Sequence, residues 1–283
     1  MAEAPGGSLI EIMHAPTRSW LRSAFTLIEL LVVTAVLSIL ATLILSGMVR
    51  AKGKAQCVAC MSKLKQWGQA TYMYAGDHED NLPRESAVDG INTWDVVGAP
   101  DNQDVWYNGL ADSAGVPTMA HYAQTPSSQQ EFYEQPSIFR CPGARFAAVA
   151  ATYPNFSLAM NSKLMLDYEG EASLPIRGST TFAPFKIDLI RVPEKTALFL
   201  DCGVPGEEQI STFQAPYSGQ PKAYASQFSA RHNRTGNILF VAGHVLTLPG
   251  DKVVDLNPDS VNRGGAIFPP TEVIWRHEPT LVP

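Results

Sequence analysis

The longest stretch of apolar sequence lies near the N-terminus, from Phe25 to Val49, and Glu29 is its only charged residue. An α-helix over these 25 residues would rise about 37 Å, more than the roughly 30 Å hydrocarbon core of a bilayer. The pattern therefore predicts a transmembrane helix over residues 25–49. A carboxylate inside such a span is costly, which makes Glu29 a candidate functional residue.

After residue 49 the apolar positions become periodic rather than continuous. Residues 51–75 contain no proline, and lysines at 52, 54, 63 and 65 occupy the positions between the apolar ones. This spacing predicts that the helix continues to about residue 75 as an amphipathic segment, residues 50–76, that packs on a globular head. The positions on its apolar face are Cys57, Cys60, Met61, Leu64, Trp67, Thr71, Tyr72 and Tyr74.

The remaining residues, 77–283, are numerous enough for one domain and contain several short β-rich runs. We predict strands over 196–200, 237–241 and 244–248, with a tight hairpin turn at Ala242-Gly243. The polar region 84–135 is interpreted as long loops, and 273–275 as a short strand in a proline-rich tail. The predicted fold class is α+β, with one long N-terminal helix packed on an antiparallel β-sheet.

The charges are unevenly distributed between the helix and the head. Residues 1–76 carry three acids and seven Lys or Arg, a net of +4, so a total of −6 leaves −10 on residues 77–283. Binding to phosphate backbones depends on Lys and Arg, so an acidic head argues against a nucleic-acid partner.

The string Ser-Ala-Phe-Thr-Leu-Ile-Glu-Leu-Leu-Val-Val, residues 23–33, resembles the prepilin signal shared by type IV pilins and type II secretion pseudopilins. The resemblance implies a pilin-like fold, a leader over residues 1–24, and cleavage between Ala24 and Phe25 by a prepilin peptidase that also methylates Phe25. It also implies that Glu29 pairs with the N-terminal amine of its own or a neighbouring subunit. The family usually has Gly before the cut, where this chain has Ala24.

This segment has two other interpretations. A secretory signal peptide has a shorter apolar region, of about 7–15 residues, followed by a small-residue cleavage motif; no Ala-x-Ala motif follows this one. A plain signal anchor is the second alternative. Positive charge is richer after the span than before it, which taken alone favours the opposite orientation. Only the prepilin resemblance places the head outside the cytoplasm.

The string Cys60-Met-Ser-Lys-Leu-Lys-Gln-Trp-Gly, residues 60–68, resembles the Cys-x-x-Asn-Leu-Lys-Gln-x-Gly signature of a large pilin-like family that is abundant in planctomycete and verrucomicrobial bacteria. Its C-terminal His-x9-Asp-Gly motif is here His-x9-Ala-Gly, with His232 retained and Ala242 in place of the Asp. The resemblance covers the chain in patches, namely 60–83, 139–142, 153–161, 193–201 and 231–245. Loss of the carboxylate weakens any metal-binding role of that motif.

The four cysteines are Cys57, Cys60, Cys141 and Cys202. Cys57-x-x-Cys60 is not followed by His, which argues against haem attachment, and a four-cysteine zinc site would need a second close pair. In an oxidising compartment a disulfide between Cys60 and Cys141 is one candidate. Buried thiols that behave as small hydrophobic groups are equally compatible with the sequence.

The sequence lacks the common catalytic motifs, and we expect neither an enzyme nor a cofactor. His232 and His244, with Asp201, are candidates for a metal site, but hydrogen-bonded structural roles are the favoured interpretation. The acidic turn at 77–80 lacks the spacing of an EF-hand. The expectation is therefore that no metal is bound.

Together these patterns predict an assembly protein, a pilin or pseudopilin of a type IV pilus or type II secretion-like filament. Its partners would be the prepilin peptidase, like subunits, the inner membrane and platform proteins. The precursor would cross the inner membrane once with its head in the periplasm, or the mature chain would lie in an extracellular filament. The alternative is a membrane-anchored extracytoplasmic binding protein, and a tethered enzyme comes third.

Overall fold

The computed structural model of the chain describes residues 25–87, 90–146, 153–164, 186–211, 214–254 and 273–275. The proposed leader and Ala24 lie outside these residues. The chain divides into two compact units, Met1–Met48 and Val49–Pro283, and both contribute to one helix, α1, Leu27–Asp77. The prediction of a single long helix is confirmed, with its end two residues beyond the expected position.

Between Leu27 and Leu45, α1 has no buried face. All residues from Phe25 to Leu45 are exposed, including the large apolar side chains. Among the described residues, α1 is the one helix that is long and apolar enough to span a membrane or to act as a signal.

The second unit contains a five-stranded sheet in the order β3-β1-β2-β4-β5. Its strands are β1 Leu158–Asn161, β2 Ala197–Asp201, β3 Lys222–Ala223, β4 Thr235–Phe240 and β5 Val245–Pro249. The expected hairpin is β4–β5, and its turn contains Gly243 at a φ of +85°, a conformation that glycine adopts without strain.

The sheet differs from the prediction in two respects. It is mostly antiparallel, but β1 and β3 pair in parallel, so it is mixed. The predicted strand at 273–275 is reduced to a single bridge between Ile274 and Thr196. Short edge pairings of this kind depend on the neighbouring strand, which a local sequence pattern does not specify.

The region 84–135 was predicted as long loops, and this was wrong. It contains α2 Trp94–Gly98, the 3₁₀ turn η1 Pro100–Asn102, α3 Trp106–Ser113, α4 Met119–Tyr122 and α5 Pro126–Glu134. Thr93, Thr118 and Thr125 cap three of these helices by accepting a backbone N–H. Helices this short show no repeated apolar period, although the threonines that cap them are typical N-cap residues. Further 3₁₀ turns are η2 Ile187–Leu189, η3 Ala225–Gln227 and η4 Gly250–Lys252.

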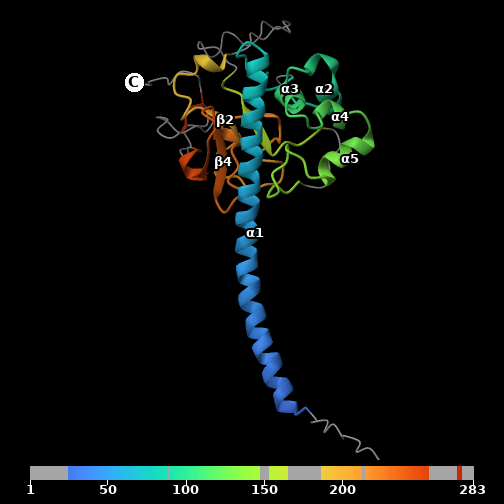
Figure 1. Ribbon diagram of the computed structural model, residues 1–283, viewed down its shortest axis with the longest axis vertical. Helices are drawn as coiled ribbons and strands as arrows, with labels where there is room; N and C mark the ends of the chain where they lie inside the picture. Colours follow the sequence, from blue (N-terminus) through green and yellow to red (C-terminus); the bar gives the residue numbers. More distant parts are fainter. Residues whose placement is uncertain are drawn as a thin grey trace, which may run out of the picture. The chain divides into compact units, whose positions relative to one another are not determined.

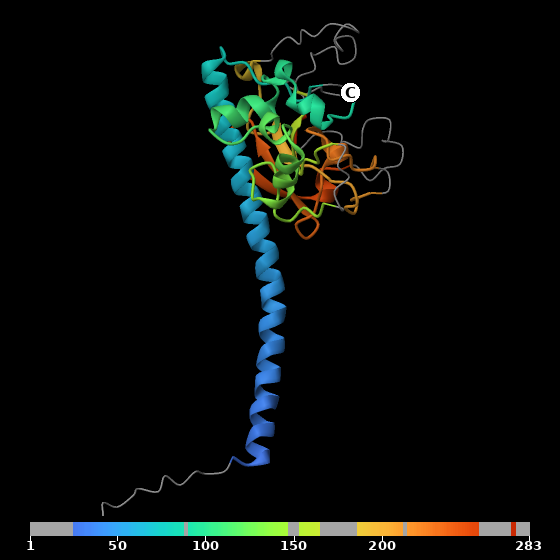
Figure 2. The same cartoon turned by 90° about the vertical axis from the view of Figure 1, so that its right-hand side faces the viewer.

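The second half of α1 packs along one face of the sheet, with α2–α5 beside it (Figures 1 and 2). Trp67 is fully buried, and its ring centroid lies 5.0 Å from those of Trp106 and Phe139 and 6.0 Å from that of Phe199. Of the predicted apolar face, Cys60, Leu64, Trp67, Thr71 and Tyr74 are buried, whereas Tyr72 is 47% exposed.

The opposite face of the sheet has its own apolar layer. It includes Ala197, Leu200, Ile238, Phe240, Val254 and Trp275, all of them buried. Because side chains alternate along a strand, Phe199 on β2 and Leu239 on β4 point to α1, while Leu200 and Ile238 point away.

Candidate functional site

A buried polar cluster lies under α1 at the end of β2. The alternation that turns Phe199 towards α1 also turns Asp201, the last residue of β2, to the same face. Asp201 is fully buried, and so is Cys60 on α1. The distance from Cys60 Sγ to Asp201 Oδ1 is 3.5 Å. A carboxylate and a cysteine sulfur therefore meet where the surrounding core is apolar and aromatic.

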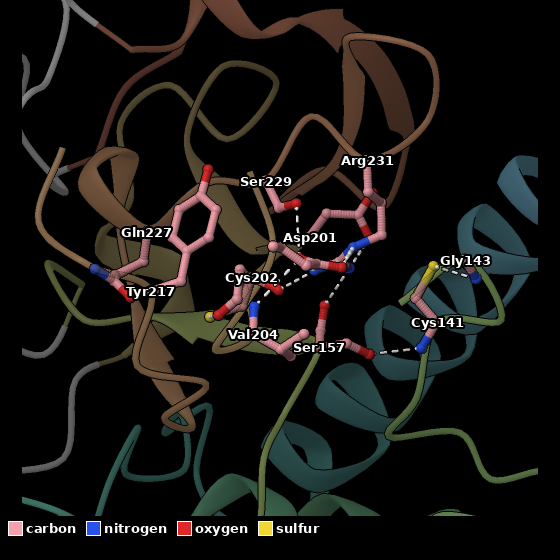
Figure 3. A network of polar contacts seen from close by, with 12 residues as sticks. Cys141, Gly143, Ser157, Asp201, Cys202, Val204, Tyr217, Gln227, Ser229 and Arg231 are labelled. Atoms are coloured by element: carbon pink, nitrogen blue, oxygen red, sulfur yellow. Dashed lines mark hydrogen bonds and ion pairs between the residues drawn. The ribbon is translucent and has the colours of Figure 1, made fainter. Parts of the chain in front are cut away.

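Cys60 forms a disulfide with Cys141, which lies 81 residues further along the chain. Cys141 begins a Cys-Pro-Gly turn that follows α5, in which the Gly143 backbone N–H donates to Cys141 Sγ at 3.4 Å. The Cys141 N–H in turn donates to Ser157 Oγ at 2.6 Å, and Figure 3 shows both contacts. The local backbone thus fixes the direction of the Cys141 sulfur.

Two residues hold the Asp201 carboxylate. The backbone and side-chain N–H groups of Asn237 donate to Asp201 Oδ2 at 2.8 and 2.9 Å, and Arg231 Nη1 lies 3.6 Å from Oδ1. Burial raises the pKa of Asp201, and the charge of Arg231 and the hydrogen bonds of Asn237 oppose that rise. Burial thus disfavours the charged form of Asp201, and its contacts with Arg231 and Asn237 partly compensate for this.

Arg231 is itself enclosed and has a second acidic partner. Its Nε and Nη2 donate to the two carboxylate oxygens of Glu207 at 2.9 and 2.8 Å. It also donates to the backbone carbonyls of Ser157 and Cys202, so that a single guanidinium joins three segments (Figure 3). Such a fork of donors suits Arg rather than Lys.

The neighbouring Cys202 differs from the cysteines of the cluster. It is fully buried, and burial raises the pKa of its thiol to about 12. The Cys202 thiol therefore remains protonated and behaves as a small hydrophobic group.

His232 enters the cluster from a tight turn that precedes β4. Its backbone pairs with Thr235 through two hydrogen bonds of 2.9 and 3.2 Å, and the intervening Asn233 and Arg234 have φ angles of +58° and +64°. His232 Nε2 lies 3.3 Å from Cys141 Sγ and 3.6 Å from Asp201 Oδ2. Burial lowers the pKa of His232 and thereby favours the neutral imidazole, although the charge of Asp201 opposes this effect.

These contacts bring together four buried side chains that are typical metal ligands. The Cys60 and Cys141 sulfurs, one Asp201 oxygen and one His232 nitrogen all lie within 4.8 Å of one another. No second group of this kind is found in the part of the chain that the structure describes. Each of the four residues lies in one of the segments in which the head resembles the planctomycete and verrucomicrobial pilin-like family. This shared location is the feature of the sequence that could have grouped them.

The other candidate ligands are not in this cluster. His232 does reach Asp201, but His244 stacks on Phe240 instead, with ring centroids 4.8 Å apart. The acidic turn at 77–80 is exposed throughout. The sequence-based grouping is therefore confirmed for His232 with Asp201, and it is wrong for His244.

At the start of α1, Glu29 takes part in a local arrangement. The Thr26 backbone N–H and hydroxyl donate to Glu29 Oε2 at 2.9 and 2.8 Å, and the Glu29 N–H donates to Thr26 Oγ1 at 3.3 Å. This reciprocal pattern is a capping box, which satisfies free backbone donors at a helix N-terminus. Phe25, immediately before it, is 67% exposed.

Comparison with protein-family models, curated proteins and solved structures gave no match to this chain. Its long apolar helix and mixed sheet are consistent with a pilin-like architecture.

Proposed function

We propose that the chain is a pilin-like or pseudopilin-like subunit that is anchored and assembled through the first half of α1. The observation that carries the proposal is the exposure of this half. Every residue from Phe25 to Leu45 is exposed, although 16 of these 21 residues are apolar. A contiguous apolar surface of this size needs a partner, either lipid or the same segment of other subunits.

Glu29 supports assembly rather than simple anchoring. Both of its bonds from Thr26 end on Oε2, which leaves Oε1 to accept from a cation. The amine created by cleavage before Phe25 would be such a cation, and a charge-assisted hydrogen bond would form most readily in an apolar filament core. A helix that only anchors a head needs no carboxylate at this depth.

A pair of substitutions separates the cap from the charge. Glu29→Gln keeps a side chain that suits a capping box but removes the charge, whereas Glu29→Leu removes both. If Glu29 pairs with an amine, both variants enter the membrane as well as wild type, and both are missing from filaments. The measurement is electron microscopy and mass spectrometry of sheared filaments, alongside quantification in the membrane fraction.

The matched control is Glu79→Gln, which removes an exposed charge in the turn that follows α1 and should assemble normally. Assembly of Glu29→Gln at wild-type levels would reduce Glu29 to a helix cap and contradict the pairing. Absence of wild-type chain from any filament, with normal membrane insertion, would favour the anchored binding protein.

Processing can be tested on protein from the native membrane. Intact-mass analysis should give a chain that lacks residues 1–24 and carries one additional methyl group on Phe25. A chain that retains its first residues, or one cut after residue 49, would contradict the prepilin-like pathway.

A further inference from the structure

We propose that Cys60, Cys141, Asp201 and His232 form a binding site for a zinc ion when the Cys60–Cys141 disulfide is reduced. The site goes beyond the proposed assembly function and does not depend on it. Two thiolates, an imidazole and a carboxylate are a complete ligand set for a tetrahedral zinc site without an open position.

The distances between the ligand atoms fit this geometry. Tetrahedral ligands at about 2.0–2.3 Å from zinc lie roughly 3.3–3.8 Å from one another. Cys141 Sγ lies 3.3 Å from His232 Nε2, Cys60 Sγ lies 3.5 Å from Asp201 Oδ1, and His232 Nε2 lies 3.6 Å from Asp201 Oδ2. The contacts of Cys60 and of His232 with Asp201 use different carboxylate oxygens. Metal binding therefore requires a small rotation of Asp201 as well as separation of the two sulfurs to about 3.8 Å, which reduction of their bond permits.

The surrounding groups prepare the ligands for a metal ion. The Gly143 N–H that donates to Cys141 Sγ favours a thiolate there. Asn237 orients Asp201, and the Thr247 hydroxyl donates to Asn237 Oδ1 at 2.6 Å, so the carboxylate is supported through two further residues. Supporting hydrogen bonds of this kind are typical of metal centres.

The electrons and charges balance. A dithiol or phosphine reductant supplies the two electrons, and two protons are taken up as the sulfur–sulfur bond breaks to give two thiols. Zn²⁺ then displaces both thiol protons. Two thiolates and one Zn²⁺ sum to zero, so the buried cluster has the same net charge as in the disulfide form, and no uncompensated charge is buried.

A catalytic Cys-His-Asp arrangement is the other chemical interpretation, and burial argues against it. Cys60, Cys141 and Asp201 are at most 1% exposed and His232 is 8% exposed, so a substrate has no access to the sulfurs. The four ligands come from α1, the turn after α5, β2 and the turn before β4. The bound ion would therefore hold α1 on the head at the same place as the disulfide.

The test uses the full chain in detergent micelles. It is reduced with a phosphine in urea under nitrogen, so that the buried bond becomes accessible, then returned to urea-free buffer and titrated with Zn²⁺ and, separately, Co²⁺. We expect one Zn²⁺ per chain, and a Co²⁺ complex with tetrahedral visible bands and sulfur-to-cobalt charge transfer. The same protein with its disulfide intact should bind at least about 100-fold more weakly, because it lacks both thiolates.

Cys60→Ser and His232→Ala should each weaken Zn²⁺ binding by at least about 100-fold, and Asn237→Ala by about 10–100-fold. Cys57→Ser is the matched control. Its thiol lies on the same helix and contacts Asn237 Oδ1 at 3.6 Å, but it is not one of the four clustered ligands, so binding should persist. His232→Cys supplies a third thiolate and should keep the ion with stronger charge transfer, which decides the matter if His232→Ala does not fold.

The proposal is overturned if reduced wild-type protein takes up no stoichiometric Zn²⁺, or if its Co²⁺ complex shows no sulfur charge transfer. It is also overturned if Cys57→Ser loses as much affinity as Cys60→Ser, or if folded His232→Cys binds neither ion.

Discussion

The two halves of α1 have similar helical backbones but opposite relations to their surroundings. From Phe25 to Leu45 most side chains are apolar, and all of them are exposed. From Cys60 to Tyr74 a single face is apolar and is almost completely buried against the sheet and α3. The first half thus presents an uncovered apolar surface, whereas the second half packs its apolar face within the head. A continuously apolar helix indicates only that its surface needs to be covered. An apolar stripe with helical periodicity indicates in addition that one face packs on a protein core.

The two halves also differ in the hydrogen-bond partners of their polar side chains. In the second half, Cys60 meets a buried cluster in which a carboxylate, a guanidinium and an imidazole have partners from several segments. In the first half, serines and threonines bond to the backbone of their own helix, as Ser38 does to the Thr34 carbonyl at 2.7 Å. A helix that meets lipid or other helices must satisfy its polar groups internally.

The largest effect is expected from truncation. A chain beginning at Ala51 keeps the buried face of α1 and should melt cooperatively, whereas one beginning at Asp77 exposes the sheet face and should aggregate. Thermal melting and size-exclusion chromatography of the two would check this. Equal cooperativity of the two chains would remove the distinction between the halves.

Trp67→Ala should lower the free energy of unfolding of the head by about 3–5 kcal/mol, because it removes a fully buried ring. Denaturant unfolding of the chain from Ala51 would measure it. Met73 lies on the same helix and is 54% exposed, so Met73→Ala should change the free energy of unfolding by less than about 0.5 kcal/mol. Similar losses at both positions would mean that α1 has no preferred face.

Leu37→Arg addresses the first half. An arginine in the middle of a transmembrane helix opposes insertion by about 2.5–3.5 kcal/mol, so the fraction of chain in the membrane should fall. Carbonate extraction of membranes would measure the fraction, with Leu37→Ile as the control. The melting of the head should be unchanged, since Leu37 belongs to the other unit; a lowered head stability would contradict their independence.

The smallest effect is expected at the glycines of the second half. A Cβ on Gly53 would meet no heavy atom within 4 Å, so Gly53→Ala should stabilise the helix by about 0.5–1 kcal/mol. A Cβ on Gly68 would lie 3.2 Å from Leu239, so Gly68→Ala should gain less or lose stability. Denaturant unfolding of both variants would decide, and a larger gain at Gly68 would argue against close packing of α1 on β4.

The parts of the fold that were predicted correctly have strong local signals. The long helix follows from a change of periodicity near residue 49, and the β4–β5 hairpin from two β-rich runs around Gly243. The helices α2–α5 were missed because four to nine residues are too few for a helical repeat. Their threonine caps were visible, but a cap alone does not distinguish a short helix from a turn.

The sequence by itself determined which segment is apolar enough to span a membrane, where the helix becomes amphipathic, and which class of fold results. These depend on spacing within one segment, and periodicity records that spacing directly. Only the tertiary structure decided that Cys60 and Cys141 meet Asp201 and His232, and that His244 does not. Residues up to 172 positions apart, as Cys60 and His232 are, become neighbours through strand order and helix packing, and no local pattern encodes either.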